Sequence, residues 1–289
     1  MTEKWSSRLF DMLNVILLSI FALLCIIPFF HVFAMSTATV KDQMSGNFIL
    51  WPKTWDFTSY IYIFDTGVFF QSFRNSVFIT VTGTAVNMIL TTFLAFALSR
   101  RKFSGRRWIM LMIIFTMMFG GGLIPTYLVV KATGLINSLW AMIIPGAVSA
   151  FNVIIIREFF EGIDEGIIES AVIDGCSDWG IFWRIVLPLS TASLATFTLF
   201  YAVGNWNQYF SAVIYINKPT LWPLQVLLRQ VVSVGQSDMF NLNDSDRPLP
   251  PAVSIQMATV ILTALPIVIL YPFLQKYFVK GVTLGAVKG

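Results

Sequence analysis

Charged residues are scarce in this chain of 289 residues. Asp, Glu, Lys and Arg make up 12% of the sequence, whereas hydrophobic residues make up 56%. A soluble domain usually carries about 25% charged residues, because its surface must face water. This sequence has too little charge to cover such a surface, so we expect part of the chain to face lipid. The net charge of +4 is modest and does not follow one polar face, which argues against a nucleic-acid-binding protein.

Histidine and cysteine are also nearly absent. His31 is the only histidine, and Cys25 and Cys176 are the only cysteines. So few potential ligands argue against a zinc or haem site, and the two cysteines fall at different predicted membrane depths, which argues against a disulfide. The sequence also lacks the Gly-x-x-x-x-Gly-Lys-Ser/Thr phosphate loop, so we do not expect it to hydrolyse ATP. We therefore expect no catalytic residue, no metal and no cofactor bound by this chain.

Long apolar runs are abundant. The hydrocarbon core of a bilayer needs roughly 20 apolar residues of helix. Six segments without a charged residue meet or approach this length: Leu13–Ala34, Val77–Leu98, Trp108–Val130, Leu139–Ile156, Thr191–Ile216 and Ala252–Leu274. The first is too long for a signal peptide, whose apolar region usually has about 7–15 residues. The sequence therefore predicts an all-α, polytopic membrane protein with six transmembrane helices.

The basic residues predict the orientation of these helices. Five of them crowd the link between the second and third spans: Arg100, Arg101, Lys102, Arg106 and Arg107. Lys and Arg concentrate in cytoplasmic loops, so this link and both termini are expected inside the cell. The resulting organisation is a cytoplasmic N-terminus (1–11), a first span (12–35), an external loop (36–71), a membrane core (72–274) with a cytoplasmic loop (157–190) and an external loop (217–251), and a cytoplasmic tail (275–289). The external loop carries an apolar stripe, Leu224, Leu227, Leu228 and Val231, that suits a short helix resting on the membrane or its own subunit, or else contacting a partner.

The cytoplasmic loop departs from the basic pattern, with seven acidic residues against two basic ones. Apolar residues before Gly175 share one side of a helix, and Trp179, Phe182, Trp183 and Val186 follow it at helical spacing. Gly175 suits a sharp turn, Ser177 or Asp178 can cap the second helix, and Pro188 disfavours continuous helix beyond it. We expect two short amphipathic helices that expose two tryptophans and a phenylalanine. Such a patch either forms a protein interface or packs against the chain's own spans.

One motif in this loop has a specific counterpart. The run Glu169-Ser-Ala-Val-Ile-Asp-Gly175, followed after nine residues by Ile185-Val-Leu-Pro188, resembles the EAA loop of binding-protein-dependent ABC importers. The one departure is Ser170 in place of alanine, and serine is small enough to preserve helix packing. The whole chain is similar to the smaller permease subunit of the maltose-type carbohydrate uptake family. The segments 120–126, 139–152 and 280–289 are similar to its branch for oligosaccharides and polysaccharide fragments, which includes permeases for lipoprotein-linked saccharide and alginate uptake.

The resemblance implies a type I ABC importer permease (MetI-like) fold and a transporter subunit, not an enzyme. It implies half of a translocation pathway for an oligosaccharide in the bacterial cytoplasmic (inner) membrane. The implied partners are a second permease subunit, two ATPase subunits that bind ATP and Mg, and an extracytoplasmic solute-binding protein. The tail 280–289 resembles a segment that reaches the ATPase interface. The residues implied to couple the loop to the ATPase are Glu169, Ser170, Ala171, Asp174, Gly175, Trp179, Phe182, Ile185, Leu187 and Pro188.

The fifth span carries polar and aromatic residues that are costly in a membrane. The candidates for the translocation pathway are Asn205, Trp206, Asn207, Gln208, Tyr209 and Asn152, with Asn87 a weaker one. Amides and aromatic faces suit sugar hydroxyls and rings, but the same residues can join helices by hydrogen bonds. Other functions remain open: an importer of peptides or polyamines, a membrane-bound glycan or lipid enzyme, or a secondary transporter. The last two would need intramembrane histidines or carboxylates, and the predicted spans contain no carboxylate and only His31.

Overall fold

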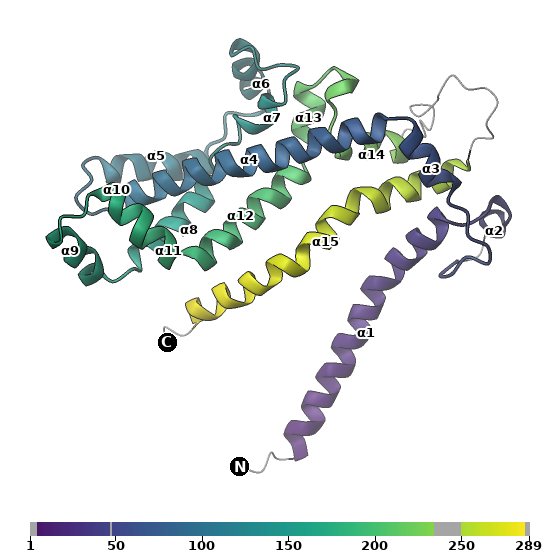
Figure 1. Ribbon diagram of the computed structural model, residues 1–289, viewed down its shortest axis with the longest axis horizontal. Helices are drawn as coiled ribbons and strands as arrows, with labels where there is room; N and C mark the ends of the chain where they lie inside the picture. Colours follow the sequence, from purple (N-terminus) through teal and green to yellow (C-terminus); the bar gives the residue numbers. More distant parts are fainter. Residues whose placement is uncertain (1–4, 47, 234–249, 287–289) are drawn as a thin grey trace. The chain divides into compact units, whose positions relative to one another are not determined.

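The computed structural model describes residues 5–46, 48–233 and 250–286, with side chains described for 10–46, 48–233 and 250–272 (Figure 1). The described residues are mostly helical and contain no strand, only one isolated β-bridge between Ala38 and Trp55. The expected all-α fold is therefore confirmed. The chain divides into two compact units, residues 1–69 with 228–265 and residues 70–227 with 266–289.

The first unit contains a long N-terminal helix and two short ones. Its helices are α1 (Trp5–Ser36), α2 (Val40–Met44), α3 (Thr58–Asp65) and the first part of α15 (Ala252–Ala286). His31 is a packed residue: its Nδ1 lies 2.8 Å from the Ile49 carbonyl, and its ring stacks on Phe48. The hydroxyls of Ser36 and Tyr60 are 2.7 Å apart, and burial raises the pKa of Tyr60 although this hydrogen bond opposes the rise.

The second unit contains most of the remaining helices. They are α4 (Val68–Ser99), α5 (Arg106–Met118), α6 (Leu123–Ala132), α7 (Trp140–Ile143), α8 (Ala150–Glu161), α9 (Glu165–Ile173), α10 (Asp178–Ile181), the π-helix η1 (Phe182–Val186), α11 (Leu187–Leu189), α12 (Thr191–Trp206), α13 (Phe210–Tyr215), the 3-10 helix η2 (Pro219–Leu221) and the first turn of α14 (Leu224–Ser233), whose remainder from Leu228 belongs to the first unit. The backbone of α15 continues to Ala286, so the predicted tail 275–289 begins as helix, and its side chains lie outside the described residues.

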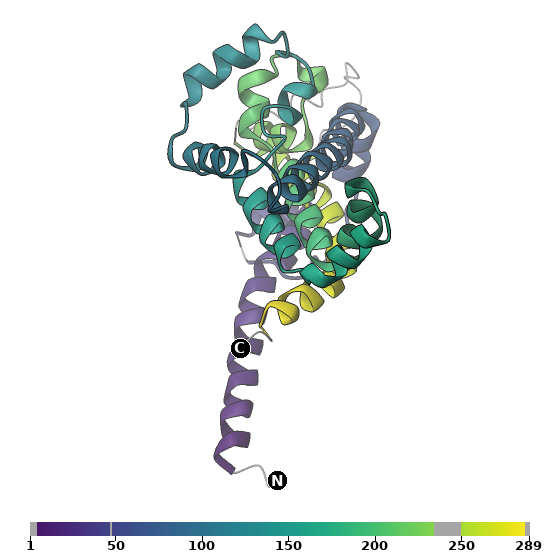
Figure 2. The ribbon, with the colours of Figure 1, turned by 90° about the vertical axis from the view of Figure 1, so that its left-hand side faces the viewer.

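Three described helices are long and apolar enough to cross a membrane without a break: Phe10–Ser36, Val68–Ser99 and Ala252–Pro272. They correspond to the first, second and sixth predicted spans. Two further candidates are bent pairs: α5 with α6, at 120°, and 178–189 with α12, at 82°. Figure 2 shows the turn between α5 and α6. By length and composition the described residues thus hold three spans, or up to five if each bent pair is one span. The six-span topology with both termini inside stays a prediction.

The fourth predicted span, Leu139–Ile156, is interrupted. Helix α7 ends at Ile143, and α8 begins only at Ala150 after Pro145 and Gly146. Proline lacks the N–H that would continue the helix, so the break frees backbone carbonyls. The Asn87 side-chain amide donates to two of them, Gly146 O at 3.2 Å and Ala147 O at 2.8 Å. A neighbouring helix therefore satisfies the break, as membrane interiors require.

The structure shows where the apolar stripe of the predicted external loop lies. The first turn of α14 is held on its own unit, because the Ser76 hydroxyl accepts from Leu224 N at 2.8 Å and Leu224 is fully buried. The predicted external loop 217–251 otherwise lies partly outside the described residues.

One apolar core packs at the end of the second unit that carries the loop 157–190, with buried residues Ala95, Ile156, Phe160, Ile181, Val186 and Phe197. This core positions the candidate site.

Candidate functional site

The loop 157–190 forms two helices joined by a tight turn, as expected. The Asp164 side chain caps α9 by accepting from Gly166 N at 2.7 Å. Beyond the end of α9, Gly175 N donates to Val172 O at 3.0 Å and Cys176 N donates to Ala171 O at 2.9 Å. This pair of bonds is the Schellman motif, which needs a left-handed residue, and Gly175 has φ of +79°.

The second helix of the loop begins at a serine cap. The Ser177 hydroxyl accepts from Gly180 N at 3.3 Å, which confirms one of the two predicted caps. The chain then passes through the π-helix η1, in which Leu187 N donates to Phe182 O. Helical structure runs past Pro188 to Leu189, the last residue of α11, and an 82° bend at Ser190 then separates it from α12. The π-turn was not predicted from the sequence, and such turns are frequent at functional sites.

The aromatic patch differs from the expectation in one residue. Phe182 was expected to be exposed, but only 1% of it is accessible, because its ring packs on Phe93 and Phe96 of α4 at 5.1 and 5.0 Å. Trp179 and Trp183 are 62% and 58% exposed, although both place an edge against Phe93. Phe182 therefore anchors the loop to its own unit, and the two tryptophans keep an outward surface.

The first helix of the loop also divides its apolar residues between two directions. Ile168 and Ala171 pack toward the buried core, whereas Ile167, Val172 and Ile173 are exposed, Ile173 by 85%. Glu169 is exposed and forms no ion pair or hydrogen bond with the described part of the chain. The loop thus presents an uncovered surface made of isoleucine, valine, tryptophan and a free carboxylate.

The remaining loop residues named from the motif occupy two environments. Asp174 and Pro188 are exposed, whereas Ile185 and Leu187 are half-buried. Ser170 is exposed and donates to Ile167 O at 3.0 Å within its own helix, so serine fits where the motif has alanine. Their roles in coupling stay a prediction.

The predicted pathway residues fall into a buried and an exposed group. Asn205 is 8% exposed and donates to Asn87 Oδ1 at 2.9 Å and Thr84 Oγ1 at 3.2 Å. Asn152 and Trp206 are also buried. Asn205 joins α12 to α4 by hydrogen bonds, which is one of the two roles considered for it, and the Trp206 ring contacts Phe73 of α4.

The exposed group lies at the break between α12 and α13. Asn207 is exposed and its Oδ1 accepts from Gln225 Nε2 at 3.2 Å. Gln208 and Tyr209 are half-buried, and Gln208 Nε2 donates to Asn205 Oδ1 at 2.9 Å. A role for these three residues in a translocation pathway stays a prediction.

Sequence reasoning missed part of this polar network. Thr84, Asn87 and Thr91 lie on one side of α4, and the Thr91 hydroxyl is 2.8 Å from the Tyr201 hydroxyl, which also accepts from Ser149 N at 3.1 Å. The spacing of three and four between the α4 residues was a readable signal. Within the described residues no group of three or more His, Cys, Asp or Glu could hold a metal ion.

Comparison with known proteins gives consistent matches over nearly the whole chain. Residues 87–284 match the family model described as "Binding-protein-dependent transport system inner membrane component". The chain is 50% identical over 98% of its length to the polygalacturonan/rhamnogalacturonan transport system permease protein YtcP of Bacillus subtilis, covering 99% of that protein. It is 45% identical over 98% of its length to protein LplC of the same organism, covering 96% of it.

A solved structure supports the fold independently. A chain in the crystal structure of a bacterial ABC transporter involved in the import of the acidic polysaccharide alginate superposes with a TM-score of 0.87 at 33% identity. The match covers 96% of this chain and 99% of that one. The fold is thus that of an ABC importer permease, and the relative YtcP is named as a transport permease and not as an enzyme. The chain belongs to the family of inner-membrane components of binding-protein-dependent transport systems.

Proposed function

We propose that this chain forms half of the translocation pathway of an ATP-driven oligosaccharide importer in a bacterial cytoplasmic membrane. One observation carries the proposal: the loop 157–190 builds two capped helices around Gly175 and leaves Ile173, Trp179 and Trp183 uncovered. Exposed aromatic and aliphatic residues of this kind usually mark a protein interface. We refer to this segment as the coupling loop.

The partner of the coupling loop is an ATPase subunit. The chain has no phosphate loop of its own, so ATP and Mg must be bound by separate chains. The free Glu169 carboxylate gives the surface a polar anchor beside its apolar residues. The remaining partners are a second permease subunit, a second ATPase subunit and an extracytoplasmic solute-binding protein that delivers the sugar.

The solute is an oligosaccharide. Two relatives are named for polygalacturonan/rhamnogalacturonan and arabinooligosaccharide transport, and the aligned crystal structure is described for alginate. The exposed amide of Asn207 can hydrogen-bond sugar hydroxyls, and the half-buried Tyr209 ring can pack on a sugar face. These side chains carry no charge, so selection of an acidic sugar falls to the second permease or to the binding protein.

Uptake into proteoliposomes tests the proposal. The four-chain importer is reconstituted, loaded binding protein is added outside and ATP is enclosed inside. We expect accumulation of labelled oligogalacturonide or arabinooligosaccharide that stops when ATP is replaced by a non-hydrolysable analogue. A matched preparation without the ATPase subunits should accumulate nothing. Sugar flux in that preparation would instead indicate a secondary transporter, and accumulation of peptide or polyamine without sugar would indicate a different solute.

A further inference from the structure

Two consecutive arginines connect the end of α4 to the coupling loop. Arg100 Nη2 lies 3.3 Å from Asp178 Oδ1, and Arg101 Nη1 lies 3.5 Å from Glu165 Oε2. Asp178 is the first residue of α10 and Glu165 is the first residue of α9. Carboxylates are favoured at helix N-termini, so each of these two carboxylates is stabilised both by the start of its helix and by its arginine. The α4–α5 turn (residues 100–105) thus reaches the start of each helix of the coupling loop.

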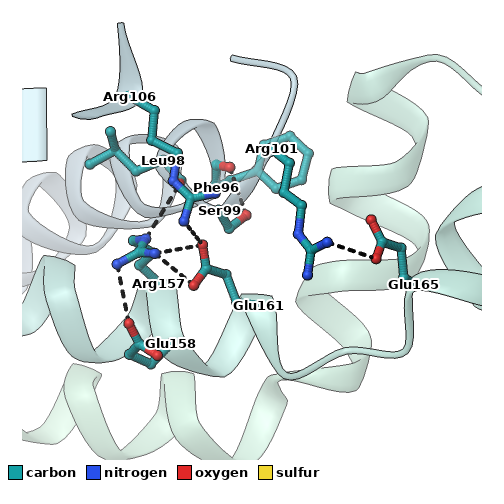
Figure 3. A network of polar contacts seen from close by, with 9 residues as sticks. All are labelled: Phe96, Leu98, Ser99, Arg101, Arg106, Arg157, Glu158, Glu161 and Glu165. Carbon is teal, nitrogen blue, oxygen red and sulfur yellow. Dashed lines mark hydrogen bonds and ion pairs between the residues drawn. The ribbon is translucent and has the colours of Figure 1, made fainter. Parts of the chain in front are cut away.

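A third connection centres on Glu161, the last residue of α8. Arg106 Nη2 lies 2.6 Å from Glu161 Oε1, and Arg157 Nη2 lies 2.7 Å from both carboxylate oxygens (Figure 3). Arg157 Nε also donates to the Leu98 carbonyl at 3.3 Å. The Glu161 carboxylate therefore joins the start of α5 to the end of α8, and Arg157 joins the same group to the end of α4.

Burial separates the strong contacts of this network from the weak ones. The side chains of Arg157, Glu161 and Arg106 are 14%, 25% and 28% exposed, whereas those of Arg101 and Glu165 are 80% and 61% exposed. Exposed ion pairs contribute little to stability, because water and salt screen them. Glu161 is shielded and shared by two arginines, so removing its charge leaves two poorly solvated cations facing each other.

The ion pairs lie beside the apolar core of this end of the unit, against which Phe96 of α4 and Ile168 of α9 pack. A cavity of about 490 Å³ lies between the α4–α5 turn and α9, lined among others by Arg101, Arg106, Glu161, Glu165 and Ile173. The turn and the first helix of the loop are therefore not in continuous contact across it. The positive-inside rule accounts for basic residues in the turn, but it does not require them to pair with the acidic loop.

From this geometry we infer that the α4–α5 turn is a second arm of the coupling apparatus, with Glu161 as its positioning residue. The inference rests on the proposed function. A displacement of α9 and α10 by the ATPase is passed through Arg100, Arg101 and Glu161 to the ends of α4 and α5, which move with the loop as one body. Helix α4 also carries Thr84 and Asn87, whose hydrogen bonds hold Asn205 and the break in the fourth predicted span. The displacement is therefore passed on to Thr84, Asn87 and Asn205, the hydrogen-bonded residues beside the proposed translocation pathway.

Substitution of Glu161 tests this inference in the assembled importer. Glu161→Gln keeps the shape of the side chain and removes both strong ion pairs. The matched control is Glu158→Gln, on the same helix, whose carboxylate is 61% exposed and, among the described side chains, pairs only with Arg157, at 3.1 Å. Coupling between sites commonly amounts to about 5- to 150-fold, so we expect Glu161→Gln to lower the stimulation of ATP hydrolysis by loaded binding protein at least about 5-fold. Glu158→Gln should leave it unchanged. Full stimulation in Glu161→Gln would overturn the inference.

A charge exchange covers the case in which Glu161→Gln fails to assemble. Arg101→Glu and Glu165→Arg alter exposed residues and each places like charges together, so each should lower the sugar transported per ATP hydrolysed. The double variant restores an opposite pair and should recover the ratio. A structural role alone would change yield or heat stability but not this ratio. Failure of the double variant to recover would contradict the inference.

A distance measurement separates failure of the inference from failure of the proposed function. Spin labels on Lys102→Cys and Ile173→Cys, with Cys25 and Cys176 replaced by serine, report the separation of the turn and α9. We expect a narrow distance distribution that does not change when the importer binds ATP, and a broad one in Glu161→Gln. A shift between the two states in the unsubstituted protein would refute the rigid connection even if uptake is normal. Absent uptake by the unlabelled, unsubstituted importer, together with a narrow distribution, would refute the proposed function alone.

Discussion

Gly83 and Gly204 are both glycines within helices, yet the space around them differs. A Cβ at Gly83 would lie 2.9 Å from Asn205 Nδ2 and 3.1 Å from its Cγ, whereas a Cβ at Gly204 would meet nothing within 4 Å. Gly83→Ala must therefore push the Asn205 amide away from Thr84 and Asn87. We expect a loss of about 1–3 kcal/mol, the cost of leaving a buried polar group unpaired.

Gly204→Ala is the matched control for that substitution. Alanine favours helix over glycine by about 1 kcal/mol, so this variant should be as stable as the unsubstituted chain or slightly more stable. Thermal unfolding of the purified chain in detergent measures both. Equal unfolding temperatures for the two variants would show that Asn205 is not held as described.

For single residues, the sequence predicted the features that depend only on neighbouring residues in the chain. Gly175 and Ser177 were predicted as turn and cap because backbone conformation and capping depend on a few neighbouring residues. The burial of Phe182 was not predicted, because helical spacing groups it with Trp179 and Trp183 and cannot show which side α4 covers. Asn205 was recognised as an unusual polar residue, but its partners on α4 are more than a hundred positions away.

The helices of the coupling loop combine an inner and an outer aromatic surface. Phe182→Ala removes a ring that is 1% exposed, and such changes usually cost about 3–5 kcal/mol. Trp183→Ala removes a ring that is 58% exposed, so the chain itself should lose little stability. If the outer surface binds the ATPase, Trp183→Ala should instead weaken that association by about 2 kcal/mol or more, as at interface hot spots.

Thermal unfolding and co-purification with the ATPase subunits measure these two effects separately. We expect Phe182→Ala to unfold at a lower temperature but, where folded, to retain the ATPase subunits. We expect Trp183→Ala to keep its unfolding temperature but to retain the ATPase subunits poorly. Normal retention of the ATPase by Trp183→Ala would contradict the assignment of the outer surface.

The sequence predicted those helices that run without a break. The apolar runs predicted α1, α4 and α15 well, because one long run without a break dictates one helix. The breaks at 119–122, 144–149 and 207–209 were not predicted, because the spans were defined by the length of uncharged runs and these runs continue through the breaks. Gly120-Gly121-Gly122 and Pro145-Gly146 were visible signals, but whether a membrane helix bends at such a site depends on a neighbour such as Asn87, which donates hydrogen bonds to the freed carbonyls.

The whole chain leaves large apolar surfaces uncovered. Helix α5 has no buried residue, and the described window of α1 is unburied in its own chain. A surface of this size needs lipid or other subunits around it, which fits a chain that works only inside a membrane complex. The sequence predicted this assembly from the loop motif, but it could not name the sugar, because the exposed pathway residues are neutral and half of the proposed pathway belongs to another chain.

The central claim is that ATP hydrolysis on partner chains drives this permease through the turn at Gly175. Gly175 has φ of +79° and a Cβ there meets nothing of this chain within 4 Å, so a residue that resists a left-handed conformation adds backbone strain of about 1–2 kcal/mol. Gly175→Asn is the control, because asparagine adopts that conformation more readily than other residues. ATP hydrolysis and sugar uptake should be measured in the same proteoliposomes. We predict that Gly175→Leu abolishes the stimulation of hydrolysis by loaded binding protein, with the chain still in the membrane, and that Gly175→Asn keeps most of it. Unchanged stimulation in Gly175→Leu would contradict the account.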